Sequence, residues 1–100
     1  IWGNGKTIRS WLHINDAVDG IIKMTTNKSK NVIYNLGSSE KTSLNEIYKI
    51  IKNKYPNSKT SVIHNKNLES GPKKRFTSCR NLKKLNWKQK VYLNKGLTLI

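Results

Sequence analysis

The sequence predicts a small α+β domain in which amphipathic helices alternate with short strands. Two kinds of observation support this class. The run Ser43-Leu44-Asn45-Glu46 is a capping box, and apolar residues recur after it at helical spacing up to Pro56. The runs 32–36 and 61–64 are short and rich in β-branched residues, and Gly37 ends the first of them. Helices and strands are therefore both expected within these 100 residues.

The opening of the chain combines a turn signal with a helix start. Asn4-Gly5 lies between extended, partly apolar segments and predicts a β-hairpin with a type I′ turn, with a strand over Ile8–Ile14. Asp16 stands just before an apolar-periodic run and is interpreted as the N-cap of a helix that continues to about Asn27. The face on which this helix is expected to pack comprises Ala17, Val18, Ile21, Ile22 and Thr25.

The same signals predict the later elements. A helix is expected over Ser43–Tyr55, packed through its apolar stripe and ended by Pro56. Leu82 and Leu85 indicate a short helix, and Trp87 is expected to be a packing anchor just beyond it. A final helix is expected to share one apolar face made of Leu93, Leu97 and Ile100.

The charge of the chain is strongly one-sided. Twenty Lys and Arg face five Asp and Glu, which gives a formal net charge of +15 and raises the hypothesis of a small basic nucleic-acid-binding module. However, 17 of the bases are lysines spread through every segment, and 13 asparagines accompany them. Nucleic-acid binders more often cluster their bases and interleave arginine and aromatic residues. Because a compositionally biased genome would produce the same surface, nucleic acid is kept only as an alternative partner.

Cysteine usage and hydropathy limit other classes. Cys79 is the only cysteine, which excludes an intrachain disulfide and argues against a metal cluster. We expect a small, half-buried side chain at Cys79 and a reducing, cytoplasmic setting. No apolar run is long enough to span a bilayer, so no membrane partner is expected.

Several short motifs follow one another in an order that resembles a known family. They are Gly3-Asn4-Gly5-x-x-x-Arg9-Ser10-Trp11-x-x-Ile14-x-Asp16, Tyr34-Asn35-Leu36-Gly37-Ser38, Gly71-Pro72 with Arg75, Leu82-Lys83-Lys84-Leu85-Asn86-Trp87 and Gly96-Leu97. In this order they resemble the C-terminal part of extended short-chain dehydrogenase/reductase enzymes, the NAD(P)-dependent nucleotide-sugar epimerases and dehydratases. The similarity covers essentially the whole chain, with a weaker middle from Asn57 to Ser70.

The resemblance implies a division of labour. Residues 1–100 would form a small C-terminal substrate-binding domain, normally packed on a Rossmann-fold domain that is absent here. That N-terminal domain would bind NAD or NADP and supply a catalytic tyrosine, and the full-length enzyme would be a homodimer. The chain begins at Ile1 without a methionine and is interpreted as a fragment. Because it contains no Gly-x-x-Gly-x-x-Gly fingerprint, we expect it to hold neither cofactor nor catalytic residues and to be inactive alone.

Arg9 is the first candidate for binding the nucleotide-sugar substrate. In the family that the chain resembles, the arginine of Gly-x-Gly-x-x-x-Arg contacts the diphosphate, and a guanidinium is a planar donor fork that matches phosphate oxygens. The alternative is a surface arginine paired with Asp16 or Asp19. Arg75 is the second candidate, because family members often place an arginine shortly after the Gly-Pro loop. Lys74 is its rival for that position.

Some positions depart from the family pattern or favour packing roles. The aspartate usual after the second arginine is missing, and Ser78 or Cys79 occupies its place. Neither His13 nor His64 has an acid or nucleophile at a suggestive spacing. The tryptophans are interpreted as core residues rather than base-stacking platforms: Trp2, Trp11 and Trp87. Within the family, Arg9-Ser10 and the residues of 35–46 look most like GDP-mannose 3,5-epimerases, with dTDP-glucose dehydratases next.

Overall fold

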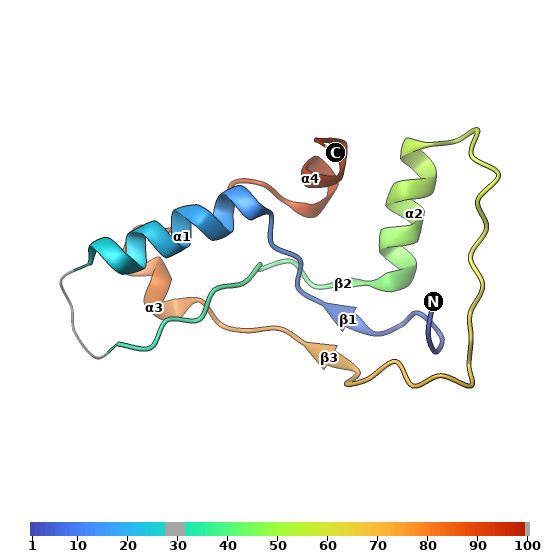
Figure 1. Cartoon of the computed structure of the whole chain (residues 1–100), viewed down its shortest axis with the longest axis horizontal. Coiled ribbons are helices and arrows are strands. Elements are labelled where there is room, and N and C mark those ends of the chain that lie inside the picture. The colour runs from blue at the N-terminus through green and yellow to red at the C-terminus, as the bar shows by residue number, and fades with distance from the viewer. Residues whose placement is uncertain (28–31, 100) are drawn as a thin grey trace.

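Helices and short strands alternate along the chain. The computed structural model describes residues 1–27 and 32–99. In chain order the elements are β1 (Ile8–Arg9), α1 (Ile14–Thr26), β2 (Thr42–Ser43), α2 (Leu44–Lys54), β3 (Lys74–Arg75), α3 (Arg80–Lys83) and α4 (Leu93–Thr98) (Figure 1). The mixture of helix and strand agrees with the predicted class, although the strands are shorter than expected.

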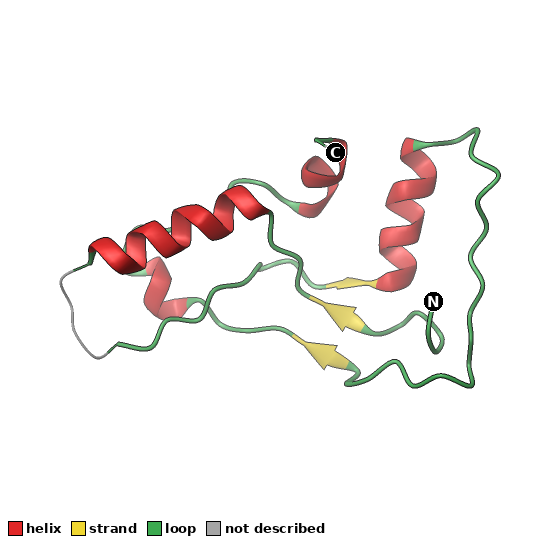
Figure 2. Cartoon of the chain, in the orientation of Figure 1, coloured by secondary structure: helices red, strands yellow, loops and turns green. Residues whose placement is uncertain are grey.

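The molecule is long and thin. Its principal extents are 51 × 29 × 14 Å, and its radius of gyration is 16.4 Å, whereas a compact domain of 100 residues has about 13 Å. Helices α1 and α3 lie at one end, α2 lies at the other, and the strands lie between them (Figure 2). The long segment that follows α2 returns along the edge of the molecule to β3 (Figure 1).

The three strands form one small sheet in the order β2-β1-β3. Strand β1 is antiparallel to β2, with Ile8 opposite Ser43 and Arg9 opposite Thr42. It is parallel to β3, which comes from the far end of the long segment after α2. The central strand is thus the one that carries Arg9.

The predicted hairpin at the opening is wrong. Gly3 and Gly5 take positive φ, at 71° each, whereas a type I′ turn at Asn4-Gly5 would need it at Asn4. The Asn4 side chain instead accepts a hydrogen bond from the Lys6 N–H, which closes an Asx turn. Trp2 pairs with Asn65 in a parallel bridge, so the segment before the turn has a partner far along the chain.

Asp16 is not the N-cap of α1. The helix begins at Ile14, and the side chain of His13 caps it by accepting a hydrogen bond from the N–H of Asn15. Asp16 lies in the first turn and is 2% exposed. Its carboxylate accepts from the backbone N–H groups of Lys90 and Val91, and so ties the C-terminal segment to α1.

The packed face of α1 also differs from the prediction. Asp16 and Gly20 are its buried residues, and a Cβ on Gly20 would lie 2.7 Å from Leu36 Cδ1 and 3.2 Å from Trp87 Nε1. The small, polar side of the helix therefore allows the close approach of Trp87. The side chains left exposed on the apolar side are Ile14, Val18, Ile21 and Ile22.

The two β-rich runs form no strands in the described chain. Residues 32–36 are extended, with Tyr34 and Leu36 packed against the core and Ile33 83% exposed. Residues 61–64 are not a strand either, although the opening segment lies beside them: the Ile1 amino group donates to the Ile63 carbonyl, and the Asn65 N–H donates to the Ile1 carbonyl. The residues of 32–36 suit a strand, but no strand of the described chain pairs with them.

Helix α2 confirms the capping box. Ser43 accepts from the N–H of Glu46 through its hydroxyl, and the Glu46 carboxylate accepts from the N–H of Ser43. The helix ends at Lys54, just before Tyr55 and Pro56, as the sequence predicts.

The core is small and lies beneath α1. Cys79, Leu82 and Trp87 are its fully buried members, and the Trp87 indole N–H donates to the Asp16 carbonyl. Trp87 and the α3 leucine therefore have the predicted packing roles, and Cys79 is buried rather than half-buried. Trp2 and Trp11 are 63% and 40% exposed, so their assignment to the core is wrong. The final helix is confirmed as α4, but Ile100 lies outside the described residues.

Candidate functional site

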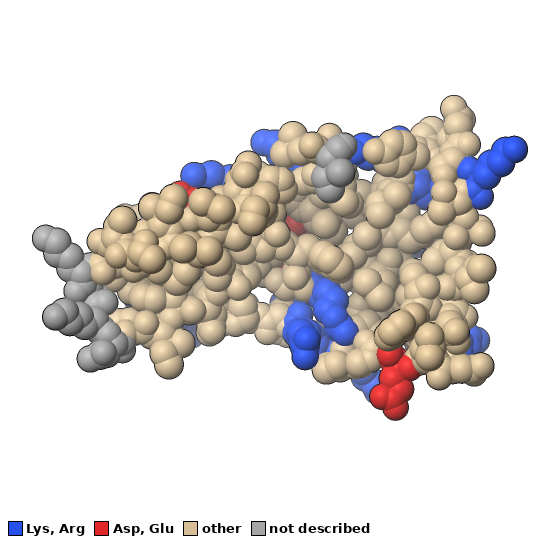
Figure 3. Space-filling model, viewed as in Figure 1, with Lys and Arg blue, Asp and Glu red and all other residues tan. Residues whose placement is uncertain are grey.

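The sheet register brings two of the three candidate residues together. Arg9 and Arg75 are direct partners across β1 and β3, while Lys74 is opposite Ile8. Directly paired residues point to the same face of a sheet, and successive residues point to opposite faces. Arg9 and Arg75 therefore share one face, and Lys74 lies on the other. Cationic side chains gather over β1 and β3 on an otherwise largely uncharged view of the molecule (Figure 3).

Arg9 is held by backbone carbonyls and not by a carboxylate. Its Nη1 donates to the carbonyls of Ile8, at 2.9 Å, and Pro72, at 2.8 Å. Its Nη2 donates to the Ser70 carbonyl at 3.1 Å. The alternative pairing with Asp16 or Asp19 is absent from the structure. Because its hydrogen-bond partners are neutral, the positive charge of Arg9 is not cancelled locally.

The Gly3-Asn4-Gly5 segment packs closely against Ser70 and against Asn45. A Cβ on Gly3 would lie 2.9 Å from Ser70 Cβ, so this glycine allows the loop that holds Arg9 to approach closely. A Cβ on Gly5 would lie 2.0 Å from the Asn45 side chain. The motif thus allows two close contacts that no larger residue would permit.

Asn45 is a positioning residue that the sequence analysis missed. Its backbone N–H donates to the Gly5 carbonyl, and its amide Nδ2 donates to the Asn4 carbonyl. Its Oδ1 pairs with His64 Nε2 at 2.8 Å. Asn45 therefore joins the start of α2, the opening turn and the segment that follows α2. It lies inside the capping-box motif, and the sequence gives no sign that its side chain contacts residues far along the chain.

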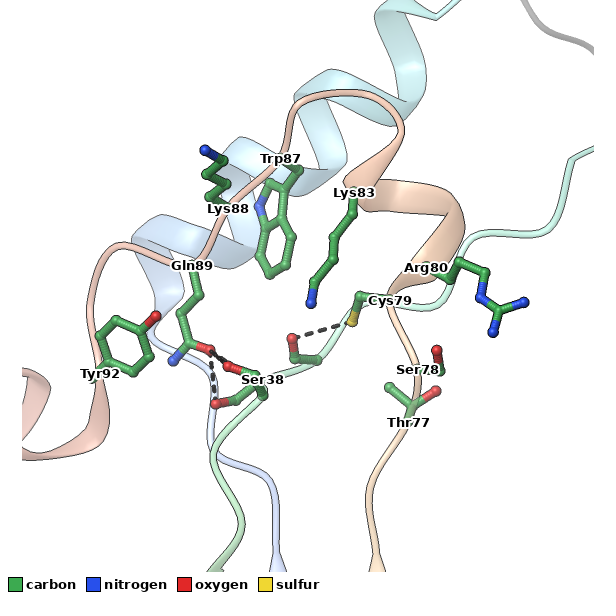
Figure 4. Close-up of a pocket in the computed structure, with 12 residues that line it drawn as sticks. Ser38, Thr77, Ser78, Cys79, Arg80, Lys83, Trp87, Lys88, Gln89 and Tyr92 are labelled. Atoms are coloured by element: carbon green, nitrogen blue, oxygen red, sulfur yellow. Dashed lines mark hydrogen bonds between the residues drawn. The ribbon is translucent and has the colours of Figure 1, made fainter.

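A separate pocket of about 550 Å³ lies between residues 37–39 and 77–92. Figure 4 shows the Lys83 ammonium extending into it between the Trp87 ring and the Cys79 thiol, while Arg80 and Lys88 point away from its centre. The Gln89 amide oxygen accepts hydrogen bonds from the Ser38 and Ser39 hydroxyls. Three residues of its lining are Lys or Arg. Lys and Arg make up 20 of the 100 residues of the chain, so this number is close to the one expected by chance. The pocket therefore gives no independent sign of an anionic ligand.

Metal and membrane roles find no support in the described residues. No cluster of three or more His, Cys, Asp or Glu there could hold a metal ion. Within the same ranges no helix is long and apolar enough to cross a membrane. Among the described residues, the glycines with positive φ belong to loops around the sheet, and none of them forms a glycine-rich turn between a strand and a helix. The described residues therefore show no dinucleotide-binding turn of this kind.

Comparison with known proteins shows which enzymes the chain resembles. The profile of the NAD-dependent epimerase/dehydratase family matches residues 1–37. A probable GDP-L-fucose synthase of Oryza sativa is 27% identical over 97% of this chain. UDP-glucuronic acid decarboxylase 4 of Arabidopsis thaliana is 29% identical over 100% of it. A UDP-glucose 4-epimerase of Thermotoga maritima, solved with UDP-glucose, superposes with a TM-score of 0.85 at 25% identity over 99% of the chain.

The chain is similar to proteins of the NAD-dependent epimerase/dehydratase family in sequence and in fold. A dTDP-glucose 4,6-dehydratase of Bacillus anthracis, solved with NAD, has the same fold, with a TM-score of 0.88 at 19% identity over 99% of the chain. Each match covers only part of the relative: 29% of the rice protein, 22% of the Arabidopsis protein and 32% of each of the two bacterial structures. The chain thus spans less than a third of the length of these extended short-chain dehydrogenase/reductase enzymes.

Proposed function

We propose that this chain is the substrate-binding portion, the C-terminal part, of a longer NAD(P)-dependent nucleotide-sugar epimerase or dehydratase. Its own task is to hold the diphosphate of the nucleotide sugar between Arg9 and Arg75. The observation that carries the proposal is the register of β1 and β3, which sets the two arginines opposite each other on one face. Two guanidiniums side by side match the several oxygens of a diphosphate better than one cation could.

The same register favours Arg75 over Lys74 as the second cation. Lys74 is opposite Ile8 and lies on the other face of the sheet. Arg75 is exposed and Arg9 half-buried, so a ligand can reach both. A ligand that spans the two arginines would leave Lys74 in solvent.

The relatives support the substrate class. Those described above are named for GDP-L-fucose, UDP-glucuronic acid, UDP-glucose and dTDP-glucose. The part that these substrates share is a nucleoside diphosphate joined to a sugar. The choice among GDP, UDP and dTDP sugars, the resemblance to GDP-mannose 3,5-epimerases included, stays a prediction.

NAD or NADP is the cofactor of the proposed enzyme. Relatives have been solved with NAD, as in the Bacillus dehydratase, and with NADPH, as in a Pseudomonas aeruginosa protein that shares the fold. Such a cofactor supplies hydride transfer. Because the described residues show no dinucleotide-binding turn, we assign to the chain only the positioning of the substrate. Holding a reactant in place can lower a barrier by several kcal/mol.

The test of this proposal compares Arg9→Ala with Lys83→Ala in the full-length protein, using GDP, UDP and a random oligonucleotide. We expect Arg9→Ala to weaken binding of the nucleoside diphosphate by about 1.5–3 kcal/mol, the scale of a lost charge-assisted contact. Arg9→Lys keeps the charge without the fork and should be only partly tolerated. NAD(P) binding should not change, and Arg75→Ala should resemble Arg9→Ala more than Lys74→Ala does.

The nucleic-acid alternative predicts a different pattern in the same experiment. Oligonucleotide affinity would fall steeply with salt, and the loss would be shared among many lysines, with no greater effect at Arg9 than at Lys83. Undiminished affinity for both nucleotides in Arg9→Ala would show that the assignment of Arg9 to the diphosphate is mistaken.

A further inference from the structure

The way in which Arg9 is held determines which part of its guanidinium a ligand can reach. A guanidinium has five N–H donors. Both Nη1 hydrogens and one Nη2 hydrogen are used, by Ile8, Pro72 and Ser70. Two donors remain, Nε–H and the second Nη2 hydrogen, and neither has a hydrogen-bond partner in the described chain.

The remaining donors form the edge that suits an oxyanion. The Ser70 and Pro72 carbonyls come from one turn and accept from Nη2 and Nη1 respectively. Nε makes no hydrogen bond in the described chain, so the edge formed by Nε and Nη2 keeps donors for a ligand. Such an edge can donate to two oxygens of one phosphate at once.

Gly71 sets both carbonyls against the guanidinium. It has φ +69°, a conformation that β-branched residues in particular avoid. A Cβ at this position would lie 3.7 Å from Arg9 Nη2, which is an ordinary contact. The constraint at Gly71 is therefore the backbone conformation and not a lack of space.

The same turn runs directly into β3. The N–H of Ile8 donates to the Lys73 carbonyl at 2.9 Å, one residue before β3 begins. A displaced turn would thus disturb the pairing that keeps Arg75 opposite Arg9.

We propose that the Ser70-Gly71-Pro72 turn is a positioning element, which fixes one edge of the Arg9 guanidinium so that the other edge faces a phosphate beside Arg75. The inference rests on the proposed function of the two arginines in diphosphate binding. It adds that the affinity for the diphosphate depends on backbone carbonyls that never touch the ligand.

Two substitutions at Gly71 separate conformation from bulk. In the full-length protein we expect Gly71→Val to weaken the binding of GDP or UDP by about tenfold, because a β-branched residue resists positive φ. Gly71→Asn adds a side chain of similar size, but asparagine adopts positive φ more readily than valine, so it should lose less affinity than Gly71→Val. Equal affinities for wild type and Gly71→Val would overturn the proposal.

A second background distinguishes positioning from general damage. Arg9→Lys removes the guanidinium whose edge the turn fixes, so adding Gly71→Val to it should cause no further loss of nucleotide affinity. If Gly71→Val lowered the nucleotide affinity tenfold both in wild type and in Arg9→Lys, the turn would have a merely structural role, and the inference would be refuted.

The last measurement needs no ligand. Amide hydrogen exchange at Ile8 reports its bond to the Lys73 carbonyl, and it should rise in Gly71→Val and Arg9→Lys but not in Arg80→Ala. Unchanged exchange in the first two variants would refute the inference. If wild type binds neither GDP nor UDP, the proposed function fails, and this exchange pattern alone decides whether the turn positions Arg9.

Discussion

At the scale of single residues, Asp16 shows how one buried carboxylate can hold two distant parts of the chain. It accepts from the N–H of Lys90, at 3.1 Å to each carboxylate oxygen, and from that of Val91 at 2.8 Å. The two donors belong to the connection between α3 and α4, which forms no ladder of its own. The carboxylate therefore accepts the backbone hydrogen bonds that the carbonyls of a neighbouring strand would otherwise accept.

Removing this carboxylate should loosen the C-terminal segment. We expect Asp16→Ala to cost about 2–4 kcal/mol of local stability, because two backbone N–H groups would be left without acceptors. Asp19→Ala is the matched control, since Asp19 lies one turn further along α1 and makes only a 3.9 Å ion pair with Lys90. Amide exchange at Lys90 and Val91 measures the effect. Similar exchange rates in the two variants would contradict this account of Asp16.

The partners of Arg9 and Asp16 could not be predicted from the sequence. Arg9 stands out in the sequence because a lone arginine follows a glycine-rich turn among lysines. The carbonyls that hold it come from Ser70 and Pro72, more than 60 residues away, and every residue type has such a carbonyl. Asp16 was taken for an N-cap because the sequence shows its place at a helix start but not that Lys90 returns to it.

At the scale of elements, the capping box was a sufficient signal, whereas signals that depend on a partner elsewhere in the chain were not. The capping box predicted α2 because Ser43 and Glu46 satisfy each other within one turn. The run 32–36 has the composition of a strand, but a strand also needs a neighbour, and its composition cannot supply one. Strand β1 lies within the predicted strand Ile8–Ile14, whereas β3 was not predicted, since its pairing with β1 joins residues 66 positions apart.

The capping box of α2 should make this helix sensitive to acid. The backbone N–H and the hydroxyl of Ser43 both donate to Glu46 and lower the pKa of that carboxyl. A pKa lowered by folding means stabilisation that is present above the ordinary value and is lost as the pH falls through the lowered one. We therefore expect the start of α2 to loosen below about pH 4.

The amide proton shift of Ser43 in NMR spectra recorded across this pH range measures the titration directly. Its midpoint should lie below the ordinary value of a glutamate, about 4.3. In Glu46→Gln the Ser43 shift should lose this pH dependence while the neutral cap remains. A Ser43 midpoint at or above that ordinary value would rule out the proposed coupling.

At the scale of the whole molecule, the thin shape leaves apolar surface exposed. The molecule is only 14 Å thick, and its described residues include three buried hydrophobic side chains. The apolar face of α1, defined by Ile14, Val18, Ile21 and Ile22, lies open. These residues recur at helical spacing, which is typical of a face that packs against another element. The apolar face predicted from this periodicity is therefore not the face on which α1 packs in the described chain.

We expect the 100-residue chain, produced by itself, to self-associate through this apolar face and to unfold below about 60 °C. Val18→Ser together with Ile22→Ser should reduce the association, because both side chains are exposed, and should lower the unfolding temperature little. Leu82→Ala is the opposite control, because it leaves a cavity at a fully buried position. It should lower the free energy of unfolding by about 2–5 kcal/mol and should not reduce self-association. Sedimentation velocity and thermal unfolding measure the two effects. A monomer that unfolds cooperatively above about 60 °C would contradict the expectation, because it would show that three buried side chains and the small sheet suffice to stabilise the chain.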